Sequence, residues 1–379
     1  LPVQKINGVL HAAVPHIPAC GWTTISNAAP APALVTLRAT AEALENEHLR
    51  LRFNRAGELA SIFDKDSMTE LAAAPCNSFR MYKDVPSWFD AWDIDSMYRD
   101  TPVNIAAPAT IEVVSSGPLA AVVRVTKPLH DSTLTQEIVL RAGSRCIEFR
   151  TVIDWQERHK LLKVNFPVTV HSNDALHEIQ FGHLRRPTHA SRQFDADRFE
   201  VAQQKWTALA EEGRGVAVLN DCKYGVNVDG NSINLTLLRA PLAPDMRADL
   251  GRQEFTYALH AWNGSFAESG VVQAAYELNV PVTTAPGDGG EYSLCSVDAP
   301  NVIIETIKPA EDGSGDMVIR LYEAMRTATA CTLRVAAPVA AARATNMLES
   351  DGKSVACRGG KIALRLRPFE VKTLRLTLK

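Results

Sequence analysis

In the middle of the chain, residues 232–239 read Ser-Ile-Asn-Leu-Thr-Leu-Leu-Arg. Apolar and polar residues alternate along this run, as they do in a strand with one buried and one exposed face. Arg239 ends the run, and Pro241 and Pro244 stiffen the loop that follows. The run predicts a half-buried β-strand with a long cation at its end, which suits an anionic or polyhydroxylated ligand or a structural carboxylate.

The same alternation recurs along the chain, in residues 145–155, 361–366 and 373–378. Glycine, proline, asparagine and aspartate separate these short runs, a pattern typical of antiparallel sandwiches. The tract 281–300 contains Thr-Thr-Ala-Pro-Gly-Asp-Gly-Gly and interrupts the runs. The sequence therefore predicts an all-β chain with a domain boundary in this tract.

Composition narrows the function classes. A formal net charge of −3 gives no electrostatic basis for binding nucleic acid. No apolar run approaches the roughly 18 residues of a membrane-spanning helix. The seven cysteines contain no Cys-x-x-Cys and favour free thiols in a reducing compartment over a disulfide framework. We expect no nucleic acid, no membrane and a cytoplasmic location.

Three more groups of residues accompany the Arg239 run. Residues 85–93 read Val-Pro-Ser-Trp-Phe-Asp-Ala-Trp-Asp, residues 44–47 read Leu-Glu-Asn-Glu, and residues 320–323 read Arg-Leu-Tyr-Glu. Taken in their order along the chain, these groups and the Arg239 run resemble the C-terminal half of the family 38 α-mannosidases, the zinc-dependent retaining group. Residues 85–93 resemble the Trp-Asp-Ala-Trp-Asp signature of the cytosolic, vacuolar and bacterial branch. Phe89 departs from that pattern, which usually carries Trp at this position.

The resemblance implies a fold. Residues 30–297 are expected to form a large antiparallel supersandwich, galactose-mutarotase-like, and residues 298–379 a smaller terminal β-sandwich. Residues 1–29 resemble the tail of a preceding small β-domain, either loosely ordered or docked on the terminal sandwich. Residues 197–212 have apolar residues at near-helical spacing, but the resemblance implies a strand and loop there. Residues 312–315, Asp-Gly-Ser-Gly, are expected to turn a hairpin.

The family's chemistry lies on an N-terminal (β/α)-type domain, where His and Asp residues hold zinc and an aspartate is the nucleophile. Nothing in this chain matches those motifs, and the chain begins at Leu1. We therefore expect a fragment of a longer enzyme that is inactive alone. It would have no catalytic residue, metal ligand or cofactor of its own, with zinc in the missing catalytic domain.

The residues of the chain, considered without the resemblance, also give no sign of a catalytic or metal-binding site. A retaining glycosidase needs two carboxyl groups about 5–5.5 Å apart, and the closely spaced Asp90, Asp93 and Asp95 read as a solvated loop. His183 and His189 flank an Arg-Arg-Pro turn, and packing is favoured over metal binding for both. No motif for nucleophilic or phosphate chemistry is present.

The resemblance also implies that some loops reach the rim of the sugar pocket. The substrate-proximal candidates are Arg239, Asp90, Trp92, Asp93 and Tyr224. Such side chains bind sugars through hydrogen bonds to hydroxyls and apolar contact with the ring face.

Each candidate has a structural alternative. For Arg239 it is a salt bridge to Asp245 or Asp249 within the same loop. For Trp92 it is a place in a core or domain interface. For Tyr224 it is a turn in which Gly225 supplies a special backbone angle. The positive cluster of residues 185–189 is typical of salt bridges between domains.

The leading hypothesis is a region that supports the catalytic domain of the same polypeptide and completes its pocket for an α-mannoside or oligosaccharide. It predicts an exposed apolar face beside residues 88–93 and Arg239, and it leaves a homo-oligomer open. A second hypothesis is a free-standing carbohydrate-binding β-sandwich, although the six tryptophans are dispersed. A third is a sugar epimerase using His177 and Glu178, but adjacent strand residues point to opposite faces.

Overall fold

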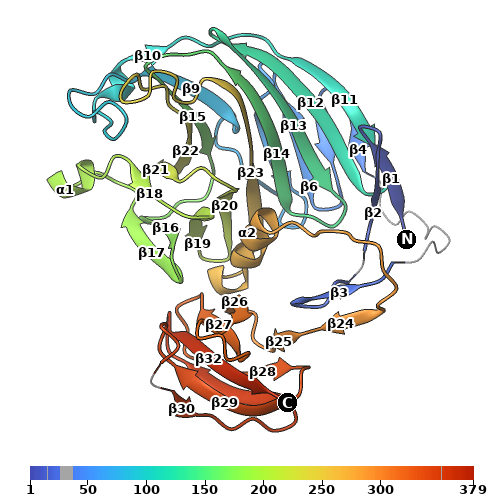
Figure 1. Cartoon of the computed structure of the whole chain (residues 1–379). Helices are drawn as coiled ribbons and strands as arrows, with labels where there is room; N and C mark the ends of the chain where they lie inside the picture. The colour runs from blue at the N-terminus through green and yellow to red at the C-terminus, as the bar shows by residue number, and fades with distance from the viewer. Residues whose placement is uncertain (15, 26–36, 351) are drawn as a thin grey trace. The chain divides into compact units, whose positions relative to one another are not determined.

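The computed structural model describes residues 1–14, 16–25, 37–350 and 352–379, which are mostly antiparallel β-strands (Figure 1). The predicted all-β class is confirmed. The described residues form few helical turns: α1 (Gln193–Ala196), α2 (Val271–Asn279) and the 3-10 turns η1 (Tyr98–Asp100) and η2 (Phe266–Glu268).

Contacts divide the chain into two compact units. The expected boundary between residues 29 and 30 lies outside the described residues, and the domains 30–297 and 298–379 stay predictions. The large unit comprises Leu1–Ala13, Ala29–Glu178 and Arg185–Pro281, and the small unit comprises Val14–Ala28, Ile179–Leu184 and Val282–Lys379.

The largest sheet has nine strands, in the order β11-β12-β13-β14-β23-β20-β19-β16-β17. Residues 197–212 supply β19 to this sheet, so the predicted strand is confirmed because pairing with β20 overrides the near-helical spacing. The strands are β11 (Thr110–Ser116), β12 (Ala120–Leu129), β13 (Ser132–Arg141), β14 (Cys146–Trp155), β16 (Asp174–Ile179), β17 (Gly182–Pro187), β19 (Trp206–Glu211), β20 (Arg214–Asn220) and β23 (Gly251–Asn263).

A second sheet of the large unit has six strands, in the order β10-β9-β15-β22-β21-β18. The alternating residues 232–238 form its strand β22, which pairs with β15 on one side and β21 on the other. The strands are β9 (Ser78–Lys83), β10 (Pro102–Val103), β15 (Lys160–Pro167), β18 (Val201–Ala202), β21 (Gly225–Asp229) and β22 (Ser232–Leu238).

Two smaller sheets complete the large unit. The N-terminal hairpin joins it through Gln4, whose Oε1 accepts hydrogen bonds from the backbone N–H groups of Leu119 and Ala120, each 2.8 Å long. This hairpin therefore belongs to the large unit. The strands are β1 (Val3–Ile6) and β2 (Val9–Ala12), then β4 (Arg38–Ala39), β5 (Ala43–Glu45), β6 (Leu49–Phe53), β7 (Leu59–Asp64) and β8 (Thr69–Glu70).

The core of the large unit is built from the alternating residues that the sequence predicts to face inward. Phe149 of β14, fully buried, contacts Phe166 of β15 and Tyr257 of β23 at ring-centroid distances of 5.7 and 5.1 Å. Burying one such side chain contributes about 1.5–3 kcal/mol. The core thus includes residues of both large sheets.

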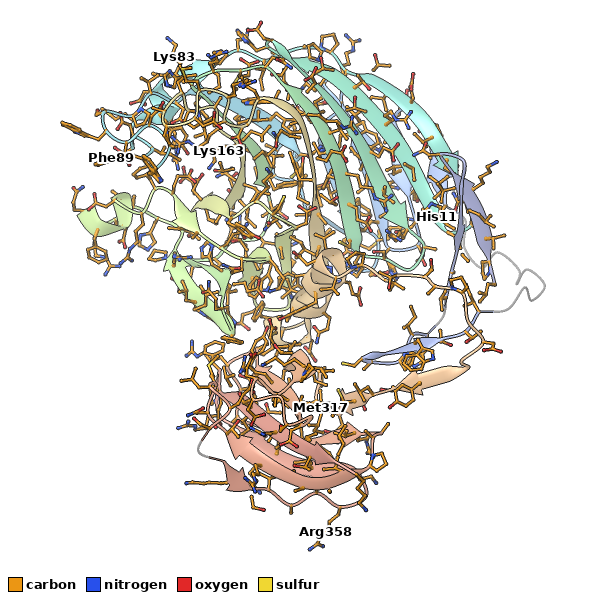
Figure 2. The ribbon with its side chains drawn as sticks, in the orientation of Figure 1. His11, Lys83, Phe89, Lys163, Met317 and Arg358 are labelled. Atoms are coloured by element: carbon orange, nitrogen blue, oxygen red, sulfur yellow. The ribbon has the colours of Figure 1, made fainter. Side chains whose placement is uncertain are left out.

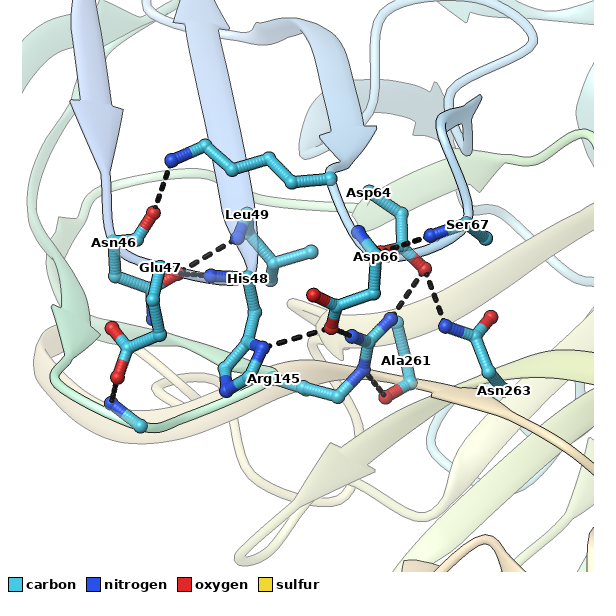
Figure 3. A network of polar contacts seen from close by, with 12 residues as sticks. Asn46, Glu47, His48, Leu49, Asp64, Asp66, Ser67, Arg145, Ala261 and Asn263 are labelled. Atoms are coloured by element: carbon cyan, nitrogen blue, oxygen red, sulfur yellow. Dashed lines mark hydrogen bonds and ion pairs between the residues drawn. The ribbon is translucent and has the colours of Figure 1, made fainter.

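A polar network connects the five-stranded sheet β4-β5-β6-β7-β8 to the nine-stranded sheet. Figure 3 shows Arg145, just before β14, donating to the carboxylates of Asp64 and Asp66. Asn263, at the end of β23, also donates to Asp64 at 3.1 Å. Asp64 is 1% exposed, whereas the Asp66 side chain is 44% exposed. The buried Asp64–Arg145 pair is therefore the central link of the network.

The small unit contains three sheets, and residues 312–316 turn the β26–β27 hairpin as predicted. Residues 21–23 form β3, which pairs with β24. The strands are β3 (Gly21–Thr23), β24 (Glu291–Ser293), β25 (Cys295–Val297), β26 (Val302–Pro309), β27 (Met317–Glu323), β28 (Thr329–Val335), β29 (Val339–Thr345), β30 (Lys353–Ser354), β31 (Lys361–Leu366) and β32 (Val371–Leu378).

Candidate functional site

Two loops of the large unit come together at one end of the six-stranded sheet. One follows β9 and spans residues 84–101; the other joins β22 to β23 and spans residues 239–250. They lie side by side in Figure 1, the first cyan and the second yellow-brown. Four of the five predicted site residues lie on these loops, so the fold brings together two motifs that are far apart in the sequence.

Arg239 binds the first loop through its guanidinium group. Its Nε donates to Asp84 Oδ2 at 2.6 Å. Its Nη atoms donate to the backbone carbonyl oxygens of Asp90 at 3.1 Å, Ala91 at 3.3 Å and Asp93 at 2.5 Å. A planar fork with several fixed donors suits such convergent acceptors better than an ammonium group does. Arg239 is thus the residue that shapes the loop.

The ion-pair partner of Arg239 differs from the prediction. Asp84 is the partner, and it is 2% exposed. Burial raises the pKa of Asp84, although the hydrogen bond from Arg239 opposes the rise. Asp249 instead accepts a hydrogen bond from the Arg239 backbone N–H at 3.0 Å, and Asp245 accepts one from the Arg247 N–H at 2.8 Å. Asp245 and Asp249 therefore accept hydrogen bonds from backbone N–H groups of their own loop, residues 239–250. The Arg239 guanidinium group binds the first loop, residues 84–101, instead.

Asp90 cross-links the two loops. Its Oδ2 accepts hydrogen bonds from the backbone N–H groups of Leu242 at 2.7 Å and Ala243 at 3.1 Å, and it lies 3.1 Å from His159 Nε2. Desolvation acts to raise the pKa of Asp90, but the hydrogen bonds from Leu242, His159 and Ala243 outweigh it and hold the pKa below its usual value. The carboxylate is therefore ionised near neutral pH and holds the loops together.

Aromatic side chains stand exposed on the first loop. Trp88 is 73% exposed, Phe89 69% and Trp92 74%. Phe89 adopts a positive φ of 53°, and its carbonyl oxygen accepts hydrogen bonds from the N–H groups of both Trp92 and Asp93. Figure 2 shows Phe89 at the outer edge of the loop. The loop therefore presents three large aromatic side chains to solvent.

The structure brings Tyr224 to the same place. Tyr224 is 51% exposed and lines a surface hollow of about 330 Å³ together with Ala91 and Arg239. Gly225 has no positive φ, so the predicted special backbone angle is wrong. A side chain there would approach Thr236 to 3.2 Å, so close packing is the reason for this glycine. Trp92 and Asp93 do not line the hollow.

Sequence reasoning missed Asp84 and His159. Asp84 immediately precedes the aromatic motif, and this adjacency was its only sequence signal. His159 Nε2 reaches Asp90, while the backbone N–H of His159 donates to the Ala240 carbonyl oxygen at 2.7 Å. Nothing in the sequence around residue 159 indicates this role, because it depends on the pairing of β9, β15 and β22.

For His183 the sequence favours packing over metal binding, and the structure gives it a hydrogen-bond contact. His183 is buried, with Nδ1 3.2 Å from the Ala324 carbonyl oxygen. Among the described residues, one His/Asp/Glu group has metal-ligand spacing: His130, Asp131 and Glu157. Glu157 accepts hydrogen bonds from the Asp131 N–H and the Ser132 hydroxyl, at 2.8 and 2.9 Å. In this structure the group stabilises the β12–β13 turn.

The buried His177 should make the free energy of unfolding depend on pH in mild acid. Burial, and then the charge of Arg186, lower the pKa of His177 to about 3, whereas an unfolded histidine titrates near 6.5. As the pH falls, the unfolded chain therefore binds a proton at His177 at a higher pH than the folded chain does. The contribution of neutral His177 to the free energy of unfolding is thus present above about pH 6.5 and is lost as the pH drops toward 3. Between pH 6.5 and 5 we expect urea unfolding to show a loss of about 2 kcal/mol. His177→Gln should remove this loss and exposed His171→Gln should retain it; equal pH slopes in both would contradict the assignment.

Two family models match the chain. The model described as "Glycosyl hydrolases family 38 C-terminal domain" matches residues 44–247. The model described as "Glycosyl hydrolases family 38 C-terminal beta sandwich domain" matches residues 301–374. The first model includes every predicted site residue.

Similar proteins agree with the family models. Alpha-mannosidase 2C1 of Homo sapiens is 40% identical over 89% of this chain and 34% of its own length, and alpha-mannosidase G of Dictyostelium discoideum is 31% identical over 88% and 32%. An alpha-mannosidase structure from Enterococcus faecalis V583 superposes with a TM-score of 0.74 at 17% identity, over 92% of this chain and 43% of that one. The chain spans about a third of the length of these curated relatives. No helix among the described residues is long and apolar enough to cross a membrane.

Proposed function

The chain belongs to glycosyl hydrolase family 38, and on that basis we propose that it is the C-terminal region of a zinc-dependent retaining α-mannosidase. The zinc and the nucleophile belong to a catalytic domain on the same polypeptide, and this region alone is inactive. Relatives that carry the name α-mannosidase along nine-tenths of the chain support the proposal. The parent enzyme hydrolyses α-mannosides in the cytoplasm; the seven free cysteines favour that compartment.

Within that enzyme, the Arg239 site completes the rim of the sugar pocket. The observation that carries this step is the Arg239 fork, which fixes the backbone of residues 90–93 while the loop's aromatics remain exposed. A rigid loop that presents Trp92 and Asp93 offers an apolar face and an acceptor for sugar hydroxyls. Asp90 holds the two loops together, and Tyr224 lines the neighbouring hollow.

The same loop supplies the contact with the catalytic domain. Six large apolar side chains are exposed on the two loops, and exposed apolar area of this kind favours a protein interface over open solvent. They are Val85, Trp88, Phe89, Trp92, Met97 and Met246.

Trp92→Ala tests the rim assignment in the polypeptide that carries both this chain and the catalytic domain. We expect kcat/KM for an aryl α-mannoside to fall about tenfold, equivalent to about 1.4 kcal/mol. Trp22→Ala is the matched control, because Trp22 is also exposed but lies in the small unit, and it should leave kcat/KM unchanged. Equal activity of the Trp92→Ala variant and the wild type would remove Trp92 from the rim.

A further inference from the structure

Three asparagines form a row across the six-stranded sheet. Asn165 of β15 pairs with Asn234 of β22, and Asn234 pairs with Asn227 of β21. Their strand neighbours, such as Val164 and Leu235, are fully buried in the core of the large unit. Because side chains alternate along a strand, the asparagines lie on the opposite, outer face of the sheet.

In two of these side chains the amide oxygen lacks a hydrogen-bond partner. The Oδ1 atoms of Asn165 and Asn227 are buried and accept no hydrogen bond, and Asn227 as a whole is 4% exposed. An unsatisfied buried acceptor costs about 1–3 kcal/mol, so such groups usually mark a place that water or a ligand fills. Asn234 is not of this kind, since Ser232 Oγ donates to it at 2.7 Å.

Asn165 and Asn227 both line a hollow of about 230 Å³ on this sheet. This volume is below the roughly 300–1,000 Å³ of sites for drug-sized ligands, and it suits one small ring. Lys163 of β15, labelled in Figure 2, is one of the residues that line the hollow. The lining residues are Tyr82, Tyr98, Arg99, Lys163, Asn165, Asn227, Asp229, Ser232 and Asn234.

The charges around the hollow are already paired. Lys163 forms an ion pair with Glu200 and donates to Thr236 Oγ1 at 2.8 Å. Arg99 forms an ion pair with Asp229 at 3.0 Å. The two cations and two anions cancel, so the hollow favours a neutral ligand. Amide groups and Tyr82, with its ring edge-on to Tyr98 at 5.0 Å, provide hydrogen bonds and an apolar wall.

We propose that this asparagine-lined cleft is a binding site for a single neutral hexopyranose. The hydroxyl groups of the sugar donate to the Oδ1 atoms of Asn165 and Asn227, and its C–H face lies against Tyr82. The cleft includes Tyr98 and Arg99 of the first loop but none of that loop's exposed aromatic side chains, and it uses no catalytic domain, so it goes beyond the proposed function.

Titration of the 379-residue chain with D-mannose or D-glucose, followed by proton–nitrogen NMR, tests the site. We expect saturable binding with a Kd of about 1–10 mM, the range for a ligand of this size without charged contacts. The side-chain amide signals of Asn165 and Asn227 should shift. Signals that stay unmoved through the titration would show a cleft filled by water only and would overturn the proposal.

Two variants locate the binding. Asn165→Ala and Asn227→Ala each remove an unpaired oxygen, so both should fold, and each should weaken binding at least fivefold. Asn104→Ala, at an exposed position outside the cleft, is the matched control and should bind as the wild type does. Unchanged affinity in both cleft variants would place the sugar elsewhere and overturn the proposal. This readout is binding by the chain itself, so its failure is distinct from a failure of the proposed α-mannosidase function.

Discussion

Arg239→Ala is expected to lower kcat/KM for an aryl α-mannoside at least a hundredfold in the polypeptide that carries this chain and its catalytic domain. The substitution removes three hydrogen bonds to the backbone of residues 90–93 at once. It also leaves Asp84, at 2% exposure, without its cation. A misplacement of about 1 Å near reacting groups is enough for a loss of this size, and we propose that this loop forms the pocket rim.

The same variant should destabilise the isolated chain. Breaking a buried ion pair by removing one partner costs about 3–5 kcal/mol, and urea unfolding measures this loss. The matched control is Arg239→Lys, which keeps the charge near Asp84 but cannot reach three carbonyl oxygens. It should recover much of the stability and little of the activity. Full activity in the lysine variant would show that the charge matters and the fork does not.

The second large effect concerns folding alone. Arg145→Ala should lower the free energy of unfolding by about 3–5 kcal/mol, because Asp64 is 1% exposed and loses the cation of its ion pair. Burial acts to raise the pKa of Asp64, but hydrogen bonds from Ser67, Arg145 and Asn263 outweigh it and lower the pKa. The wild-type pair therefore contributes at neutral pH and is lost in acid.

Asp66 offers an internal control, since it binds the same arginine. Its side chain is 44% exposed, and solvent-exposed ion pairs contribute only about 0–1 kcal/mol. Asp66→Ala should therefore cost at most about 1 kcal/mol in urea unfolding, and Asp64→Ala several times more. Equal costs for Asp64→Ala and Asp66→Ala would contradict the distinction between the buried and the exposed pair.

Much of the fold could be predicted from the sequence because period-two alternation records which face of a strand is buried. The run before Arg239 and the run around Phe149 both form strands with the expected residues inside. Residues 197–212 show where prediction from the local sequence pattern fails. Their spacing is near-helical, and only the pairing of β19 with β20 decides the strand.

The candidate site shows a different limit. The sequence nominated Arg239 and residues 90–93 separately, but nothing in it states that the guanidinium holds that backbone. The contact depends on the order β9-β15-β22 in the sheet, which brings Asp84 beside Arg239 across 155 positions of sequence. Asp245 and Asp249 were the predicted ion-pair partners of Arg239 because they are close to it in sequence. The asparagine row was missed for the same reason, since its members lie on three strands.

The central proposal is that the hydrolytic chemistry lies outside this chain and that the Arg239 site serves it. Hydrolysis of p-nitrophenyl α-mannoside, with zinc present, tests it most directly when the 379-residue chain is compared with the polypeptide that includes the catalytic domain. We predict turnover by the longer polypeptide and none by the chain. Turnover by the chain that survives repurification would place a catalytic carboxylate pair within these residues and contradict the proposal.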